Sequence, residues 1–254
     1  MDKERRLIIA GNWKMNKTVA EGLALVNGIK RELTNVKEVD IVVCPPFTAL
    51  NEVSRAILNS NIRLGAQNVC EHGYGAYTGE IAVGMLKEFS VRYVIVGHSE
   101  RRQYQKETDA LIANKALAVH GGALKPIVCV GETLAEREAG STEKVLDTQV
   151  RGSFAGLSKE QMAETIVAYE PVWAIGTGKT ATAAQAQEAH AFIRRLIGKV
   201  FDESIARRVR IQYGGSVKPS NARELMGLPD VDGALVGGAS LEDRSFADIV
   251  RNSI

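Results

Sequence analysis

Short, almost fully apolar segments alternate along this chain with longer segments in which apolar residues recur every three or four positions. The short segments predict strands at residues 7–13, 40–44, 62–67, 93–96, 126–130, 165–169, 209–213 and 233–236. Most are rich in Val and Ile at successive positions, which is typical of strands buried on both faces of a parallel sheet.

The longer segments at 21–33, 108–119 and 183–197 predict amphipathic helices, each long enough to cross from one strand to the next. No long Pro-, Gly- or Ser-rich linker interrupts the order, which predicts one domain over residues 1–254. A closed eight-stranded barrel and an open doubly wound sheet both fit this order. The length of 254 residues is near the ~250 typical of the (β/α)8 barrel. No GxGxxG fingerprint follows the first strand, so we predict an α/β chain folded as a (β/α)8 TIM barrel.

Composition excludes several classes of function. The chain is 45% hydrophobic with a net charge of +2 and has no basic block, so we expect neither nucleic acid nor membrane as a partner. Its longest apolar runs are far shorter than the ~18 residues of a membrane span, and its first residues do not resemble a secretory signal. Three cysteines without a CxxC pair predict a cytoplasmic protein, and four scattered histidines predict no metal site.

Polar and glycine residues follow strands that are otherwise apolar. In chain order they are Asn12, Lys14, Gln67, His98, Ser99, Glu100, Cys129, Glu170, Gly214, Gly215, Ser216, Gly237 and Gly238. The carboxyl ends of barrel strands converge on one mouth, so these residues are candidates for a shared site.

Three ionisable candidates, Lys14, His98 and Glu170, each have a structural alternative: a surface lysine, a strand-end histidine bonded to a backbone carbonyl, and a surface salt bridge, respectively. Lys14 alone fits a surface lysine, but strand alternation places Asn12 on the same side, as an anion site requires. His98 precedes a Ser-Glu helix start, where the helix dipole disfavours a cationic ring. Glu170 follows an apolar strand and precedes Pro171; burial predicts a raised pKa, which suits a general base.

Two glycine pairs follow the last two predicted strands, Gly214-Gly215 and Gly237-Gly238. Glycines let a backbone approach a ligand and leave amides free for an anion. The loops after the last two strands form the phosphate site in many such barrels, so we expect a phosphate here.

The stretch EPVWAIGTGKT at 170–180 ends like a nucleotide-binding phosphate loop. That loop needs GxxxxGK[ST], and the position of its first glycine is Trp173. The segment therefore predicts a lid with glycines at its tip, and no nucleotide.

Six motifs together resemble the triosephosphate isomerases. They are NWKMN at 12–16, GAYTGE at 75–80, GHSERR at 97–102, AYEPVWAIGTGK at 168–179, QYGGSV at 212–217 and GGASL at 237–241. They run from the first predicted strand to the last, in the order of that family.

The resemblance implies interconversion of dihydroxyacetone phosphate and glyceraldehyde 3-phosphate through an enediolate, with no cofactor. It makes Glu170 the base, Lys14 and a neutral His98 the groups that stabilise the enediolate oxygen, with Asn12 beside them and Glu100 behind His98. Cys129 resembles a residue packed near the base. The amides of Gly176, Ser216, Gly237 and Gly238 are expected to hold the phosphate.

The same resemblance implies a lid and a homodimer. Residues 171–181, including Trp173 and Gly178, resemble the lid, and Tyr213 with Ser216 resembles its latch. Thr78 resembles the tip of a loop that enters the other subunit near Lys14 and Met15, and Glu80 and Arg101 are expected to pair in that interface.

Two other functions remain open from the residues alone. A barrel that binds a sugar phosphate without catalysis would share the glycine pairs, but it would not need Lys14, His98 and Glu170 together. An aldolase would need a Schiff-base lysine inside a central strand, and Lys14 lies beyond its strand.

Overall fold

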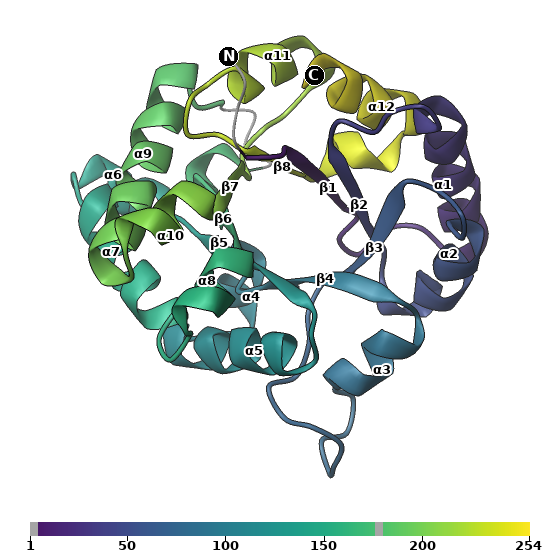
Figure 1. Ribbon diagram of the computed structural model, residues 1–254, viewed down its shortest axis with the longest axis horizontal. Coiled ribbons are helices and arrows are strands. Elements are labelled where there is room, and N and C mark those ends of the chain that lie inside the picture. The colour runs from purple at the N-terminus through teal and green to yellow at the C-terminus, as the bar shows by residue number, and fades with distance from the viewer. Residues whose placement is uncertain (1–4, 176–179) are drawn as a thin grey trace.

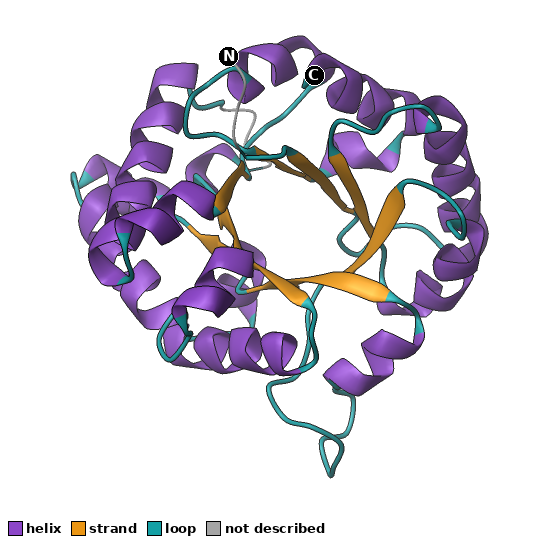
Figure 2. Cartoon of the chain, in the orientation of Figure 1, coloured by secondary structure: helices purple, strands orange, loops and turns teal. Residues whose placement is uncertain are grey.

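A computed structural model describes residues 5–175 and 180–254, and in it eight parallel strands close into a barrel (Figures 1 and 2). The strands are β1 (Ile8–Asn12), β2 (Asp40–Cys44), β3 (Ile62–Ala66), β4 (Val91–Val96), β5 (Lys125–Val130), β6 (Ile166–Tyr169), β7 (Arg210–Tyr213) and β8 (Gly233–Val236). Neighbours in sequence are neighbours in the barrel, and β8 closes against β1 with Gly233 opposite Ile8. The barrel prediction is confirmed, and the open sheet is wrong.

Helices form a ring outside the strands, as Figure 2 shows. The longer ones are α1 (Val19–Leu33), α5 (Asp109–Gly121), α7 (Thr142–Ser153), α9 (Ala183–Val200) and α12 (Asp243–Asn252). Shorter ones are α2 (Leu50–Ala56), α3 (Val83–Glu88), α4 (Ser99–Tyr104), α6 (Leu134–Glu138), α8 (Lys159–Glu164), α10 (Glu203–Arg208) and α11 (Pro219–Met226). Single 3₁₀ turns lie at η1 (Phe47–Ala49), η2 (Val172–Ala174) and η3 (Gly238–Leu241).

Alternate strand residues point to opposite faces of the barrel wall. Ile8 and Ala10 of β1 belong to one buried cluster with inward residues such as Ile127, whereas Ile9 belongs to the larger cluster under the helices. Both faces are therefore dry, which explains why the strands are apolar at successive positions.

Local capping sets where the helices begin. The Thr18 hydroxyl accepts from the amide of Glu21, whose carboxylate accepts from the Thr18 amide. Helix α1 thus starts two residues before the predicted position 21. The same arrangement of Thr182 and Gln185 starts α9 just after the predicted lid.

Across the described residues, each helix is too short or too polar to cross a membrane.

Candidate active site

Residues from five strand ends surround one cavity of about 280 Å³ at the carboxyl end of the barrel. The predicted site residues that line it are Asn12, Lys14, His98, Glu170, Ser216, Gly237 and Gly238. The structure brings these groups to one cavity, whereas Gln67, Ser99, Glu100 and Cys129 of the same strand-end series do not line it. The predicted Gly214 and Gly215 line the cavity as well, as do Ala174 and Ile175 of the predicted lid. Lys218 and Leu235 also line the cavity and were not predicted.

Glu170 directly follows β6 and is only 2% exposed. Its backbone amide donates to the carbonyl of Val130 at 2.8 Å, which continues the pairing with β5 for one more residue. Its carboxylate has two donors, since Oε1 lies 2.8 Å from His98 Nε2 and Oε2 accepts from the Ser99 amide at 2.8 Å. The carboxylate is thus held at the start of α4.

The predicted raised pKa of Glu170 is wrong. Burial raises the pKa of this carboxyl, but His98, the Ser99 amide and Lys14 together lower it by more than burial raises it. The pKa of Glu170 is therefore below its usual value. The sequence argument considered burial alone, whereas the donors come from another strand end. Glu170 is therefore ionised, as a base has to be. Burial of the Cys129 thiol, and after it the charge of Glu170, raise the pKa of that thiol.

His98 is the N-cap residue of α4, as the sequence predicts. Its Nδ1 accepts from the Glu100 amide at 3.2 Å, so the single proton of a neutral ring lies on Nε2 and points to Glu170. Burial lowers the pKa of His98, but the carboxylates of Glu170 and Glu100 raise it above its usual value. The expectation that the helix start disfavours a cationic ring is therefore wrong in this arrangement, because the two carboxylates outweigh burial.

Lys14 reaches the cavity through a strained turn. It lies two residues beyond β1 with φ of 52°, a left-handed conformation that is uncommon outside glycine. Its amide donates to Asn12 Oδ1 at 3.0 Å, and its carbonyl accepts from Gln67 Nε2 at 2.8 Å. This turn, and not strand alternation, brings Asn12 and Lys14 together.

Glu100 lies behind this pair. Its Oε1 is 2.5 Å from Lys14 Nζ, and its Oε2 is 3.5 Å from His98 Nδ1. It lines an adjacent hollow rather than the cavity itself. It can position Lys14, therefore, without facing a ligand.

Gly214 leaves room for the buried carboxylate. A Cβ atom at this position would lie 2.9 Å from Glu170 Cγ and 3.0 Å from the Tyr169 carbonyl oxygen. The predicted Gly214-Gly215 pair thus also serves Glu170, besides its place beside the cavity.

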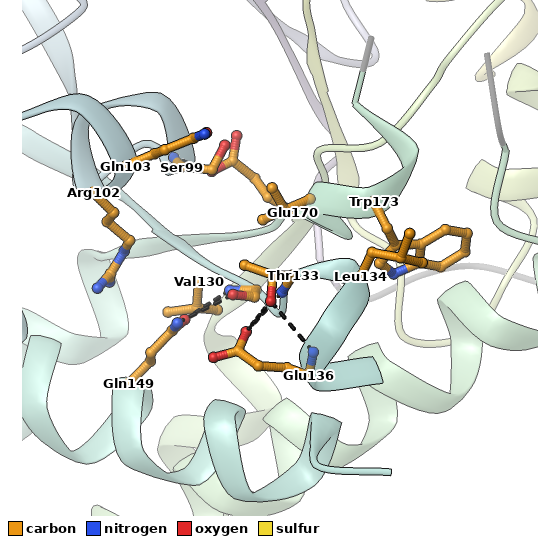
Figure 3. A pocket seen from close by; sticks show the side chains of 12 residues that line it. Ser99, Arg102, Gln103, Val130, Thr133, Leu134, Glu136, Gln149, Glu170 and Trp173 are labelled. Atoms are coloured by element: carbon orange, nitrogen blue, oxygen red, sulfur yellow. Dashed lines mark hydrogen bonds between the residues drawn. The ribbon is translucent and has the colours of Figure 1, made fainter. Parts of the chain in front are cut away.

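The first part of the predicted lid is anchored to the barrel. Trp173 Nε1 donates to Glu132 Oε1 at 2.9 Å, and the guanidinium of Arg137 lies 4.6 Å from the Trp173 ring centroid. Glu132 is fully buried and also accepts from Tyr169. Trp173 and Glu170 line a neighbouring pocket of about 590 Å³, shown in Figure 3. Trp173, which occupies the position where a phosphate loop needs glycine, thus holds the first part of the lid to Glu132.

The remaining lid and latch residues divide into two groups. Gly176 and Gly178 lie outside the described residues. Tyr213 is fully buried; burial raises the pKa of Tyr213 to about 12, and the backbone of Ala181 lowers it in part. Tyr213 therefore adjoins the end of the predicted lid, although it does not line the cavity.

Of the residues predicted for a subunit interface, Met15 and Arg101 line one hollow, whereas Thr78 and Glu80 lie outside it. Thr78 and Glu80 are exposed on the loop between β3 and α3, which extends away from the barrel in Figure 1. Met15 is 95% exposed. Arg101 is bound within the chain, with Nε 2.7 Å from Glu107 Oε1.

Two contributors were missed from the sequence. The amide of Ser99 and the carboxylate of Glu132 hold the base and the lid. Ser99 follows His98 in the strand-end series, but nothing local reveals its bond to Glu170. A carboxylate two residues after β5 could have marked Glu132 as a strand-end candidate. Among residues 5–175 and 180–254, no group of His, Cys, Asp and Glu side chains could hold a metal ion.

A family model, curated relatives and a solved structure all match this chain to the same family. The family described as "Triosephosphate isomerase" matches residues 7–253. The chain is 57% identical over 246 residues to the triosephosphate isomerase of Moorella thermoacetica, covering 97% of this chain and 98% of that one. It is 56% identical over 247 residues to that of Herpetosiphon aurantiacus, covering 97% and 99%. The crystal structure of the Bartonella henselae triosephosphate isomerase superposes with a TM-score of 0.88 at 41% identity, covering 97% of this chain and 98% of that one.

Proposed function

The chain belongs to the triosephosphate isomerase family, and on that premise we propose that the cavity between Lys14, His98 and Glu170 is its active site. The reaction interconverts dihydroxyacetone phosphate and glyceraldehyde 3-phosphate by moving a proton between two carbons. The observation that carries the assignment is that one ionised carboxylate, one ammonium and one imidazole line the same small cavity. A protein that only bound a sugar phosphate would not need this trio.

Glu170 takes the proton from the carbon next to the carbonyl. Its carboxylate is ionised and shielded from water, so the proton it takes can be returned to the neighbouring carbon. Both of its oxygens are engaged by His98 and Ser99 without a substrate. The carboxylate therefore leaves at least one of these donors before it reaches the substrate.

Lys14 and His98 stabilise the negative charge that develops on the carbonyl oxygen. Fixed donors stabilise such an oxygen best when they are already oriented before the reaction. The Nδ1 bond keeps the His98 proton on Nε2, and the strained turn holds Lys14 in place. Asn12 orients that turn through the Lys14 amide.

We infer that the phosphate lies against Ser216, Gly237 and Gly238, which line the same cavity. These residues follow β7 and β8, where barrels commonly bind phosphate through backbone amides. Lys218 adds a positive charge to the same wall. We include Gly176 in this phosphate site from the family resemblance.

Residues 171–181 close over the bound substrate. Trp173 anchors one end of this segment and the Thr182–Gln185 cap fixes the other. Closure would exclude water and protect an enediolate that could otherwise eliminate its phosphate. Tyr213 adjoins Ala181 and acts as a latch with Ser216.

We infer that two copies of the chain form a homodimer. The exposed stretch 72–80 of the loop between β3 and α3 carries two large side chains that face solvent, Tyr74 and Tyr77, which are 72% and 46% exposed. A hollow of about 380 Å³ beside Lys14 and Met15 is available to receive the same loop from a second copy. A two-fold dimer would bury both surfaces at once and support Lys14 from behind.

We also infer that the protein works in the cytoplasm. Cys44, Cys70 and Cys129 are all free and buried, which suits a reducing compartment.

Turnover of dihydroxyacetone phosphate, coupled to oxidation or reduction of its product and measured without added metal or nucleotide, tests the assignment. We expect activity in the wild type and almost none in Glu170→Gln, with phosphate-ester binding retained in both. Binding without turnover in the wild type would instead establish the non-catalytic alternative.

A further inference from the structure

A second charged hollow of about 580 Å³ lies at the opposite end of the barrel from the active site. It is lined by the first residues of three strands, Asp40 of β2, Lys125 of β5 and Arg210 of β7. Helices α8 and α10, which lie beside each other in Figure 1, contribute the rest of the wall together with Arg5 and Arg6.

The residues that line this hollow carry a larger net positive charge than the whole chain does. Its basic residues are Arg5, Arg6, Lys125, Arg207, Arg208 and Arg210, and its acidic residues are Asp40 and Glu164. The lining therefore carries a net charge of +4, whereas the whole chain carries +2. Such a concave positive surface attracts anions.

The acidic residues do not neutralise the hollow. Asp40 is shared by two guanidinium groups, with Arg6 Nε at 2.9 Å and Arg210 Nη1 at 2.7 Å. Glu164 is paired with Lys125 and also interacts with the charges of Arg208 and Arg210. Asp232, which does not line the hollow, accepts from Arg5 Nε at 2.8 Å. These pairs fix the positions of four basic side chains and still leave positive charge in excess.

Arg207 and Arg208 face solvent without a hydrogen bond or ion pair of their side chains within the described part of the chain. They are not needed to end α10, because Arg194 Nη1 already donates to the carbonyls of Ala206 at 2.7 Å and Val209 at 2.8 Å. Arg5 Nη1 donates to the Arg207 carbonyl at 3.2 Å, which holds this backbone in place. Two guanidinium groups are thus available on a fixed backbone.

We propose that this hollow binds a polyphosphate group of the kind found in pyrophosphate and nucleoside triphosphates. Guanidinium groups bind phosphate oxygens through paired N–H donors. A phosphate monoester carries at most about two negative charges, so a ligand that balances the excess of three left once Asp232 is counted has two or more phosphoryl groups. The site lies apart from Lys14, His98 and Glu170 and does not depend on their assignment.

Isothermal titration of the full-length protein with metal-free pyrophosphate, orthophosphate and ATP tests the proposal. We expect pyrophosphate to bind at least tenfold more tightly than orthophosphate, and the double variant Arg207→Ser/Arg208→Ser to weaken it at least tenfold. Lys87→Ser/Lys144→Ser removes two exposed charges elsewhere and should change the affinity less than twofold. ATP binding more tightly than pyrophosphate assigns the hollow to a nucleotide, and equal binding assigns it to the phosphates alone.

The active site also attracts anions, so Lys14→Ala is titrated in parallel and should retain pyrophosphate binding. The double Arg variant should keep full isomerase activity, which shows that it is folded. Pyrophosphate binding that is no tighter than that of orthophosphate, is unchanged in the double variant, or is lost in Lys14→Ala would overturn the proposal. Tighter binding of a single-stranded oligonucleotide than of pyrophosphate would overturn it as well.

Discussion

His98 and Glu170 form a direct bond across the mouth of the barrel, with His98 Nε2 2.8 Å from Glu170 Oε1. Each group moves the pKa of the other, because the ring lowers the pKa of the carboxyl and the carboxylate raises that of the ring. The pair keeps the base ionised before substrate binds. It also ties up one oxygen of the base, so substrate binding has to compete with this bond.

Glu170→Asp shortens the side chain by one methylene and withdraws the base from the substrate. Because proton transfer depends steeply on position, we expect kcat to fall about 100-fold. Binding of a phosphate monoester, measured by calorimetry, should change by no more than about twofold. Glu188→Asp on the exposed face of α9 is the matched control and should leave kcat unchanged. Equal losses in kcat and in phosphate binding would count against Glu170 as the base.

His98→Gln removes the imidazole ring that lowers the pKa of Glu170 while keeping an amide donor. The pKa of Glu170 should therefore rise, and the acid limb of the kcat/KM profile should move to higher pH. We expect kcat to fall about 100-fold or more at the optimum, because a donor to the developing oxyanion is lost.

The control for this pH experiment is His120→Gln on α5, which does not line the cavity and should leave the acid limb in place. If the acid limb of the kcat/KM profile stays at the same pH in His98→Gln, the group that titrates in this limb is not Glu170.

Gly214→Ala places a methyl group 2.9 Å from Glu170 Cγ. The side chain of the base has to shift, so we expect kcat to fall about tenfold or more, with a loss of stability of about 1–3 kcal/mol from overpacking. Gly121→Ala adds its methyl group where no atom lies within 4 Å and should affect neither quantity in steady-state kinetics and thermal unfolding. Full activity in Gly214→Ala would show that the base tolerates displacement.

Trp173→Phe deletes the hydrogen bond that anchors the lid to Glu132. We expect a loss of stability of about 1 kcal/mol and faster amide exchange at residues 172–175, measured by hydrogen–deuterium exchange. Glu132→Gln can still accept from Trp173 and should exchange at these residues nearly as the wild type does. Unchanged exchange in Trp173→Phe would mean that other contacts anchor this end of the lid.

Met15→Arg places a charge on a side chain that is 95% exposed in the single chain. If a second copy covers it, the charge has to be buried, so we expect monomers in sedimentation velocity and a loss of activity of about tenfold or more. Leu58→Arg changes another exposed apolar residue, two residues after the end of α2, and should remain dimeric. A dimer that persists unchanged in Met15→Arg would place the interface elsewhere.

Much of this protein follows from its sequence. Successive apolar residues predict strands buried on both faces, and every predicted strand lies within two residues of the observed one. Because the carboxyl ends of barrel strands converge, the polar residues after those strands could be assigned to one cavity before the tertiary structure was considered.

Only the tertiary structure decided how those groups are tuned. The amide of Ser99 and the ring of His98 reach Glu170 across about seventy residues of chain, and they reverse the pKa direction that burial alone predicts. Lys14 reaches the cavity through a left-handed turn. Gln67, directly after β3, supports this turn because its Nε2 donates to the Lys14 carbonyl. Local sequence patterns predict which residues are buried and where strands end. The pKa of a buried group depends instead on which residues, distant in the sequence, become its neighbours.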